Sequence, residues 1–141
     1  MTVASLGFGQ APGIVGAACE ARVRRAVFLS STSIYTTLNP HSKGVRIAAE
    51  ERIKQSGLPF TILRPTMIYG SSRDRNMSRL IRLIQRWRVV PVVGPGTFLQ
   101  QPVYVGDVAE AVVLSLSSDR AVGGCYNIAG CLLYTSPSPR D

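Results

Sequence analysis

Short runs of consecutive apolar residues, separated by helix-length segments, constrain the fold of this chain most strongly. Residues 25–30 (RAVFLS) and residues 60–63 (FTIL) are two such runs. Strands that alternate apolar and polar residues have one face in water, whereas continuous apolar runs are typical of strands buried on both faces. Segments with helical apolar spacing lie between and after the runs. This order predicts an α/β fold, in which a parallel sheet is flanked by helices.

The helix ends are predicted from capping and turn residues. Pro12 fits the first turn of a helix that runs to about residue 21, because its missing N–H has no acceptor to lose there. Ser42 is a candidate cap for a helix over residues 43–56, and Gly57 fits its left-handed end. The buried stripe of this helix is expected at Val45, Ala49 and Ile53.

The second half of the chain predicts further elements. Helices are expected at residues 76–87 and 108–117, and strands at residues 89–93, 103–105 and 126–129. Asp107, with Glu110 three residues later, predicts a capping box for the last helix. The inward residues of the first of these helices are expected to be Met77, Leu80, Ile81 and Ile84.

The chain has 141 residues, which allows one small domain at most. Apolar residues make up 45% and charged residues 17%, so the chain can form a core. Its apolar runs are far shorter than the roughly 20 residues of a membrane span. A secretory signal starts with a positively charged segment, and no Lys or Arg precedes Arg22 here. Cys19, Cys125 and Cys131 have no disulfide-framework or zinc spacing. We therefore expect a cytoplasmic protein with free thiols, no membrane partner and no metal site.

The charge balance leaves three interpretations open for an arginine-rich segment. The net charge is +8, and residues 73–88 hold six of the 14 Arg with a single acid. Helical spacing places Arg79, Arg82 and Arg86 on one face. We favour a solvated surface for this face. A site for a substrate phosphate is the second interpretation, and a nucleic-acid surface is the third. We expect no nucleic-acid partner, because Trp87 alone offers an aromatic ring among these arginines.

Both ends of the chain have unusual features. Residues 131–141 (CLLYTSPSPRD) resemble a transposon-based sequencing adapter translated in frame, and an ordinary disordered tail is the alternative. Residues 1–5 read like the end of a buried strand with no complete unit before it. We expect a fragment truncated at both ends, with residues 1–130 as the folded part.

Four segments, in this order, resemble the extended short-chain dehydrogenase/reductase family of the NAD-dependent epimerase/dehydratase type. They are Ser-Ser-x-x-x-Tyr at residues 30–35, Ser-Lys at residues 42–43 with Ala-Ala-Glu at residues 48–50, Leu-Arg-Pro-x-x-x-Tyr-Gly at residues 63–70, and Val-x-Asp-Val-Ala at residues 105–109. The resemblance implies the C-terminal part of a Rossmann-type doubly wound parallel sheet. That sheet is incomplete, because the first βαβ units and their glycine-rich phosphate-binding turn are missing.

The resemblance also implies roles for individual residues. Ser31 would hydrogen-bond the reacting carbonyl or alcohol oxygen, and Lys43 would bind the nicotinamide ribose. The cofactor is NAD or NADP, a choice that the remaining sequence does not decide. Implied cofactor-binding residues are Ser30, Lys43, Pro65 and Thr66, and implied substrate-binding residues are Met67 and Gln101.

Two residues depart from the family pattern. Asn39 stands four residues before Lys43, where the family has its acid/base Tyr, and an amide cannot supply that titratable proton. Tyr35 is a weak candidate for the substitute. Met67 stands where sugar-nucleotide enzymes usually have Asn, and a thioether donates no hydrogen bond. Both changes indicate an atypical member.

Two functions therefore compete. The leading hypothesis is an NAD(P)-dependent oxidoreductase or epimerase that acts on a carbonyl or secondary alcohol of a small molecule, a nucleotide sugar being one candidate. The alternative is a non-catalytic dinucleotide-binding protein used for sensing or assembly. A homodimer is the oligomer that we consider, and the sole histidine, His41, is expected at the surface beside Pro40.

Overall fold

The computed structural model describes residues 1–6, 9–37, 41–70, 77–88 and 101–132. The strands are β1 (Thr2–Ser5), β2 (Ala26–Leu29), β3 (Phe60–Pro65), β4 (Ile68–Tyr69), β5 (Val103–Tyr104) and β6 (Cys125–Ile128). The helices are α1 (Ala11–Glu20), α2 (His41–Gln55), α3 (Met77–Trp87) and α4 (Val105–Ser117), with short 3₁₀ turns η1 (Thr32–Tyr35) and η2 (Asp119–Ala121). The predicted strand at residues 89–93 lies outside the described residues.

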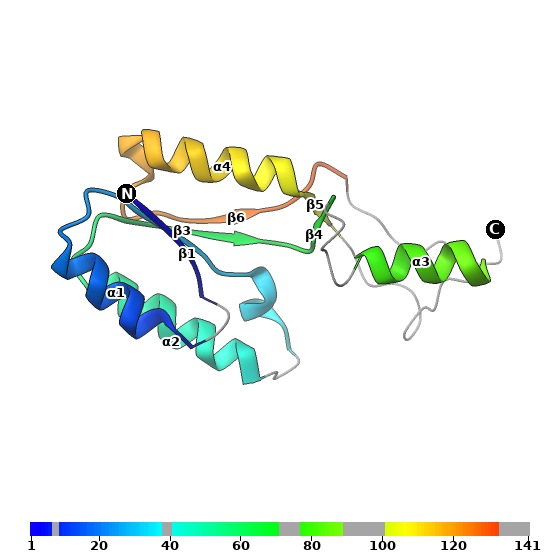
Figure 1. The fold of residues 1–141 in the computed structure, drawn as a ribbon, viewed down its shortest axis with the longest axis horizontal. Coiled ribbons are helices and arrows are strands. Elements are labelled where there is room, and N and C mark those ends of the chain that lie inside the picture. Colours follow the sequence, from blue (N-terminus) through cyan, green and yellow to red (C-terminus); the bar gives the residue numbers. More distant parts are fainter. Residues whose placement is uncertain (7–8, 38–40, 71–76, 89–100, 133–141) are drawn as a thin grey trace.

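A parallel sheet in the order β1-β2-β3-β6 forms the centre of the fold. Phe28 pairs with Ala4 on one side and with Ile62 on the other, so the carboxyl ends of the strands lie at one edge. Helices α1 and α2 cover one face of the sheet and α4 covers the other (Figure 1). The predicted α/β fold with a parallel sheet is confirmed. Strands β4 and β5 form a separate parallel pair beyond β3.

The main apolar core lies between the sheet and the α1–α2 layer. Phe28, Ile53 and Ile62 are fully buried at its centre, and Val15 and Ala18 extend it along α1. Continuous apolar strands give this result because both of their faces are covered. Strand β2 confirms the prediction, since three of its four residues are buried.

Strand β1 is a strand as predicted, but its burial differs from the expected fully buried pattern. Its residues alternate between half-buried and exposed, and Val3 is 48% exposed. The reason is geometric. Helix α4 contacts β2 and β3, whereas the same face of β1, an edge strand, has no helix over it among the described residues.

Several predictions of helix ends are confirmed and two are wrong. Pro12 lies in the first turn of α1, and Gly57 has a positive φ of 71° after α2. Helix α2 begins at His41, one residue before Ser42, so Ser42 lies inside its first turn. Helix α4 begins at Val105 with Tyr104 as its N-cap and no side-chain cap, so Asp107 is a first-turn acid. There it complements the positive end of the helix dipole.

Another prediction fails on α3. Ile81 was expected to face inward, but it is 47% exposed. In Figure 1, α3 lies beyond the end of the sheet and away from the other helices. Met77 and Ile84, which belong to the same predicted inward face, are half-buried, so the described residues cover that face only in part.

Replacing Phe28 with alanine should destabilise the fold strongly. The Phe28 side chain is fully buried between two strands and a helix layer, and such a truncation leaves a cavity that costs about 3–5 kcal/mol. Val113→Ala is a control, because Val113 is 63% exposed on α4 and should change stability by less than about 0.5 kcal/mol. Denaturant unfolding measures both, and equal effects would contradict this description of the core.

Candidate functional site

The carboxyl ends of β2, β3 and β6 bring several predicted site residues to one edge of the sheet. The Ser30 N–H donates to the Leu63 carbonyl at 2.8 Å, and the Thr66 N–H donates to the Ile128 carbonyl at 2.9 Å. These bonds extend the sheet just past its strands and fix their ends relative to one another. In α/β sheets, ligands bind beyond this edge.

Ser31 is positioned by the turn that it begins. Its backbone is extended, and its Oγ accepts a hydrogen bond from the Ser33 N–H at 3.2 Å, which caps η1. The side chain is half-buried. A serine hydroxyl that accepts through its oxygen can still donate its proton. Ser31 is thus a positioned donor at the strand end, as its implied role requires.

Lys43 and Tyr35 have different partners. The Lys43 Nζ, in the first turn of α2, donates to the Thr36 carbonyl at 2.6 Å. The Tyr35 hydroxyl accepts from the Arg64 guanidinium at 2.8 Å and donates to the Asn127 Oδ1 at 3.4 Å. The Arg64 guanidinium also lies over the Tyr35 ring, 5.7 Å from its centroid. These bonds give Tyr35 a cation partner, but that cation is not Lys43.

A buried ion pair lies directly beneath this edge. Glu50 of α2 is 3% exposed, and the Nε of Arg64 on β3 donates to its two carboxylate oxygens at 3.0 and 3.2 Å. The Arg64 Nη2 donates to the same carboxylate at 2.5 Å. Planar, multiply bonded contacts of this kind are the strong form of an ion pair.

The two charges stabilise each other. Burial by itself raises the pKa of Glu50, but hydrogen bonds from Arg64, with help from Ser30 and the positive charges of Arg64 and Lys54, hold that pKa below its ordinary value of 4.5. The hydrogen bond to Glu50 likewise raises the pKa of Arg64. Both groups are therefore charged at neutral pH.

Ser30 lies on the buried side of the same strand end and is 8% exposed. Within the described part of the chain, its Oγ makes no hydrogen bond of ordinary geometry, although it lies close enough to help lower the pKa of Glu50. The structure therefore places Ser30 beside Glu50 of the ion pair.

The other predicted residues continue along the edge towards β5. Thr66 donates through Oγ1 to the Gln101 carbonyl at 2.6 Å, and the Gln101 side-chain amide donates to the Gly130 carbonyl at 2.7 Å. Met67 is 41% exposed beside them. Thr32 links this group to the Ser31 turn, because its Oγ1 lies 3.5 Å from the Pro65 carbonyl. The structure thus connects the residues from Ser31 to Gln101, whereas Asn39 lies outside the described residues.

Glu50 and Arg64 both stand in the family-like motifs, but the motifs did not predict their ion pair. A usable signal was present. Glu50 follows the buried Ala49 on the inward face of α2, and Arg64 interrupts an apolar strand. A charged residue on each of two buried elements predicts a pair, because an isolated buried charge is strongly unfavourable.

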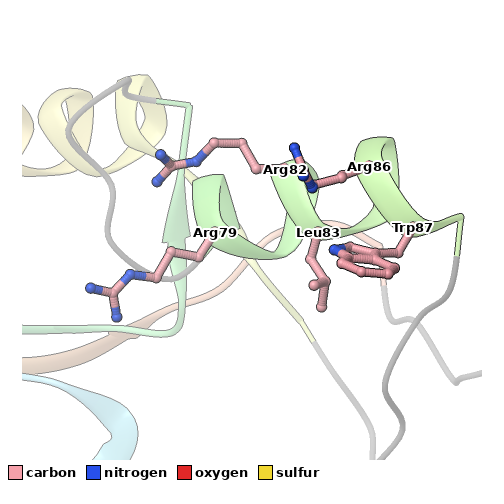
Figure 2. Close-up of a pocket in the computed structure, with 5 residues that line it drawn as sticks. All are labelled: Arg79, Arg82, Leu83, Arg86 and Trp87. Atoms are coloured by element: carbon pink, nitrogen blue, oxygen red, sulfur yellow. The ribbon is translucent and has the colours of Figure 1, made fainter.

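The arginine-rich helix lies apart from this edge. Arg79, Arg82 and Arg86 are exposed, and with Leu83 and Trp87 they line a shallow, open pocket (Figure 2). Arg86 lies over the Trp87 ring, 5.9 Å from its centroid. Among the described residues, those that line the pocket all belong to α3, which favours a solvated face.

Comparison with known proteins agrees with this geometry. The parallel sheet with helices on both faces and a polar strand-end edge defines a Rossmann-type domain. Residues 44–129 match the NAD dependent epimerase/dehydratase family, and the chain belongs to that family.

Individual relatives show how far the similarity extends. The chain is 34% identical over 92 residues to "NADH dehydrogenase [ubiquinone] 1 alpha subcomplex subunit 9, mitochondrial" of Arabidopsis thaliana, which covers 64% of this chain and 23% of that protein. It is 28% identical to MoeE5 in complex with UDP-glucuronic acid and NAD, with a TM-score of 0.75, over 92% of this chain and 50% of that one.

A third similarity concerns the fold alone. The dTDP-glucose 4,6-dehydratase of Bacillus anthracis, in complex with NAD, is 16% identical with a TM-score of 0.79, over 96% of this chain and 53% of that chain. The chain therefore spans about a quarter of the curated relative and about half of these solved structures.

No helix in the described ranges is long and apolar enough to cross a bilayer.

Replacing Glu50 with glutamine should lower the free energy of unfolding and make it depend less on pH in the acidic range. Because the pKa of Glu50 is lowered by folding, its ion pair stabilises the fold above the ordinary value of 4.5, and this contribution is lost as the pH falls below it. We expect a loss of about 1.5–3 kcal/mol at about pH 7, the range for a hydrogen bond to a charged group. We also expect a shallower decline in stability from about pH 5 to about pH 3.

Glu51→Gln is the matched control, because Glu51 is the next residue on α2 and its carboxylate is exposed. Its effect on the free energy of unfolding should stay below about 1 kcal/mol, as for exposed ion pairs. Urea unfolding over this pH range measures both variants, and identical profiles would refute a special role for Glu50.

Replacing Arg79, Arg82 or Arg86 with glutamine tests the solvated-face interpretation of α3. Each change should alter stability by less than about 0.5 kcal/mol, because these side chains are exposed. A tenfold loss of affinity for a phosphorylated ligand, equivalent to about 1.4 kcal/mol, would instead assign the helix to a phosphate site. Binding calorimetry on the full-length protein distinguishes the two results.

Proposed function

We propose that the full-length protein binds NAD across the carboxyl ends of β2, β3 and β6. The observation that carries this proposal is the connected series from Ser31 to Gln101, in which a positioned hydroxyl, a nearby ammonium group and two strand ends share one edge. In this proposal, residues 1–130 supply the nicotinamide side of the domain. The glycine-rich turn for the pyrophosphate belongs to another part of the protein.

The residues present fit the nicotinamide half of the cofactor. The family resemblance assigns Ser31 to the substrate's reacting oxygen, and in this proposal its hydroxyl donates to the cofactor instead. Lys43 offers a cation at the start of α2, and Pro65 and Thr66 present backbone at the end of β3. Bound NAD supplies the hydride acceptor for redox chemistry. The part of this chain is to hold the ring against the strand ends and to orient donors toward it.

The contacts favour NAD binding without the family's usual proton transfer. The ammonium group of Lys43 is engaged by the Thr36 carbonyl, and the Tyr35 hydroxyl is engaged by Arg64 and Asn127. The position of the usual acid/base Tyr holds Asn39. Among the described residues, Tyr35 therefore makes no pair with Lys43, and position 39 carries an amide in place of a phenol. The family's Tyr–Lys arrangement for general acid/base catalysis is thus not found in the described part of the chain.

We therefore favour the sensing or assembly function over turnover. The Arabidopsis relative supports this choice, because its name describes a subunit of an NADH dehydrogenase. By that analogy the partner of this protein is an NADH dehydrogenase assembly. The cytoplasmic location expected from the sequence stays a prediction, and the relative's name places that protein in mitochondria.

An oxidoreductase or epimerase is the second candidate, and one observation favours it. Ser31 holds a hydroxyl where a carbonyl or alcohol oxygen would react, and such preorganised donors stabilise developing charge. The similarity to MoeE5, solved with UDP-glucuronic acid and NAD, makes a nucleotide sugar the substrate class to test first. In this candidate Met67 and Gln101 line the substrate side.

Calorimetry on the full-length protein tests NAD binding. We expect Ser31→Ala to weaken binding about threefold to tenfold, which corresponds to one lost hydrogen bond of about 0.5–1.5 kcal/mol. Ser117→Ala is the control, because the Ser117 hydroxyl donates to the Val113 and Leu114 carbonyls within the exposed end of α4. Residues 1–141 alone should bind NAD far more weakly. Submicromolar binding by this segment, or no binding by the full-length protein, would overturn the proposal.

Turnover assays with carbonyl and UDP-sugar substrates decide between the two candidates. No turnover by a protein that binds NAD is the expected result. If turnover is found, the enzyme hypothesis replaces the sensing or assembly function. In that case Ser31→Ala should lower kcat by about 10²-fold, the scale of one preorganised donor, and Tyr35→Phe by less than tenfold.

A further inference from the structure

The turn that carries Ser31 is held from three sides. Helix α2 holds it through Lys43, which donates to Thr36, and through Arg46, whose Nη1 lies 3.4 Å from the Ser33 Oγ. Strand β3 holds it through Arg64, which donates to Tyr35. Strand β6 holds it through Asn127, which accepts from the same hydroxyl. The position of the turn therefore depends on side chains from three separate elements.

Arg64 is a member of the buried ion pair and also bonds to the turn. Its Nε and Nη2 donate to Glu50, and its Nη1 donates to the Tyr35 hydroxyl at 2.8 Å. The side chain is 12% exposed and that of Glu50 is 4% exposed. A guanidinium has a rigid fork of donors, so the carboxylate fixes its plane and thereby the direction of the bond to Tyr35.

The energetics of buried ion pairs suggest what this pair contributes. Desolvation offsets most of the attraction between two buried charges, so such pairs add little net stability compared with apolar residues of similar size. They can instead fix one geometry among several. Here the fixed geometry includes the end of β3, because Arg64 immediately precedes Pro65, whose carbonyl lies 3.5 Å from the Thr32 hydroxyl.

We propose that Arg64, oriented by Glu50, is a positioning residue for the dinucleotide site and acts through the Tyr35 hydroxyl. This inference rests on the proposed NAD binding. Arg64 touches no cofactor in this account. It holds the turn at residues 32–35 against the end of β3, and so holds the Ser31 donor in place before the cofactor arrives. Preorganisation of this kind raises affinity because less ordering remains to be done on binding.

The test uses Arg64→Lys, Tyr35→Phe and their combination in the full-length protein. Lysine keeps a cation beside Glu50 and avoids an orphaned buried carboxylate, but one ammonium group cannot reproduce the fork that joins Glu50 to Tyr35. Arg52→Lys is the matched control, because Arg52 is exposed on α2. Ile53→Val controls for a general loss of core stability, since Ile53 is fully buried on the same helix.

Two readouts are needed. We expect Arg64→Lys and Tyr35→Phe each to raise the Kd for NAD about tenfold, equivalent to about 1.4 kcal/mol. Because both changes break the same Arg64–Tyr35 connection, the Kd of the double variant should exceed that of the weaker-binding single variant by no more than about twofold. In the cofactor-free protein, the Ile34 and Thr36 amides, which close the turn onto Ser31 and Ser33, should exchange about tenfold faster in the single variants.

Both controls should leave these values within about twofold of the unsubstituted protein. The proposal is overturned if Arg64→Lys binds NAD as Ile53→Val does, if the two single effects multiply, or if the Ile34 and Thr36 amides keep their exchange rates. A protein that binds no NAD before substitution contradicts the proposed function. In that case, amide exchange still decides whether Arg64 positions the turn.

Discussion

The Glu50–Arg64 ion pair is the contact on which the candidate site depends most. It joins α2 to β3 beneath the carboxyl edge of the sheet, and through Tyr35 and Asn127 it reaches η1 and β6. The apolar core around Phe28 supplies most of the burial, but apolar packing is not directional. The ion pair adds the direction that apolar packing lacks, because its hydrogen bonds are satisfied in only one arrangement of strand ends and helix.

The sequence predicted the layers of this fold better than its boundaries. Continuous apolar runs identified β2 and β3, because a strand covered on both faces has few alternative patterns. Helix starts were less predictable. Ser42 and Asp107 are good caps by residue type, yet α2 begins at His41 and α4 begins at Val105, so each of the two residues lies inside the first turn of its helix. The exposure of Ile81 depends on what packs against α3, which helical spacing alone does not contain.

The candidate site was predictable to the level of motifs and no further. The motif segments predicted Ser31 and Pro65 at the carboxyl ends of their strands, which share one edge in any parallel sheet. The partners of each side chain depend on distances between elements, so the bonds from Lys43 to Thr36 and from Arg64 to Tyr35 required the structure. Those bonds favour NAD binding over catalysis as the proposed function of this member of the NAD dependent epimerase/dehydratase family.

The most direct test of this account is an experimental structure of the full-length protein with NAD at saturating concentration. The account predicts the nicotinamide ring at the carboxyl ends of β2 and β3, with Ser31 and Thr66 in contact and the Arg64–Tyr35 bond intact. A nicotinamide bound elsewhere on the protein, or a strand-end edge without cofactor under these conditions, would contradict it.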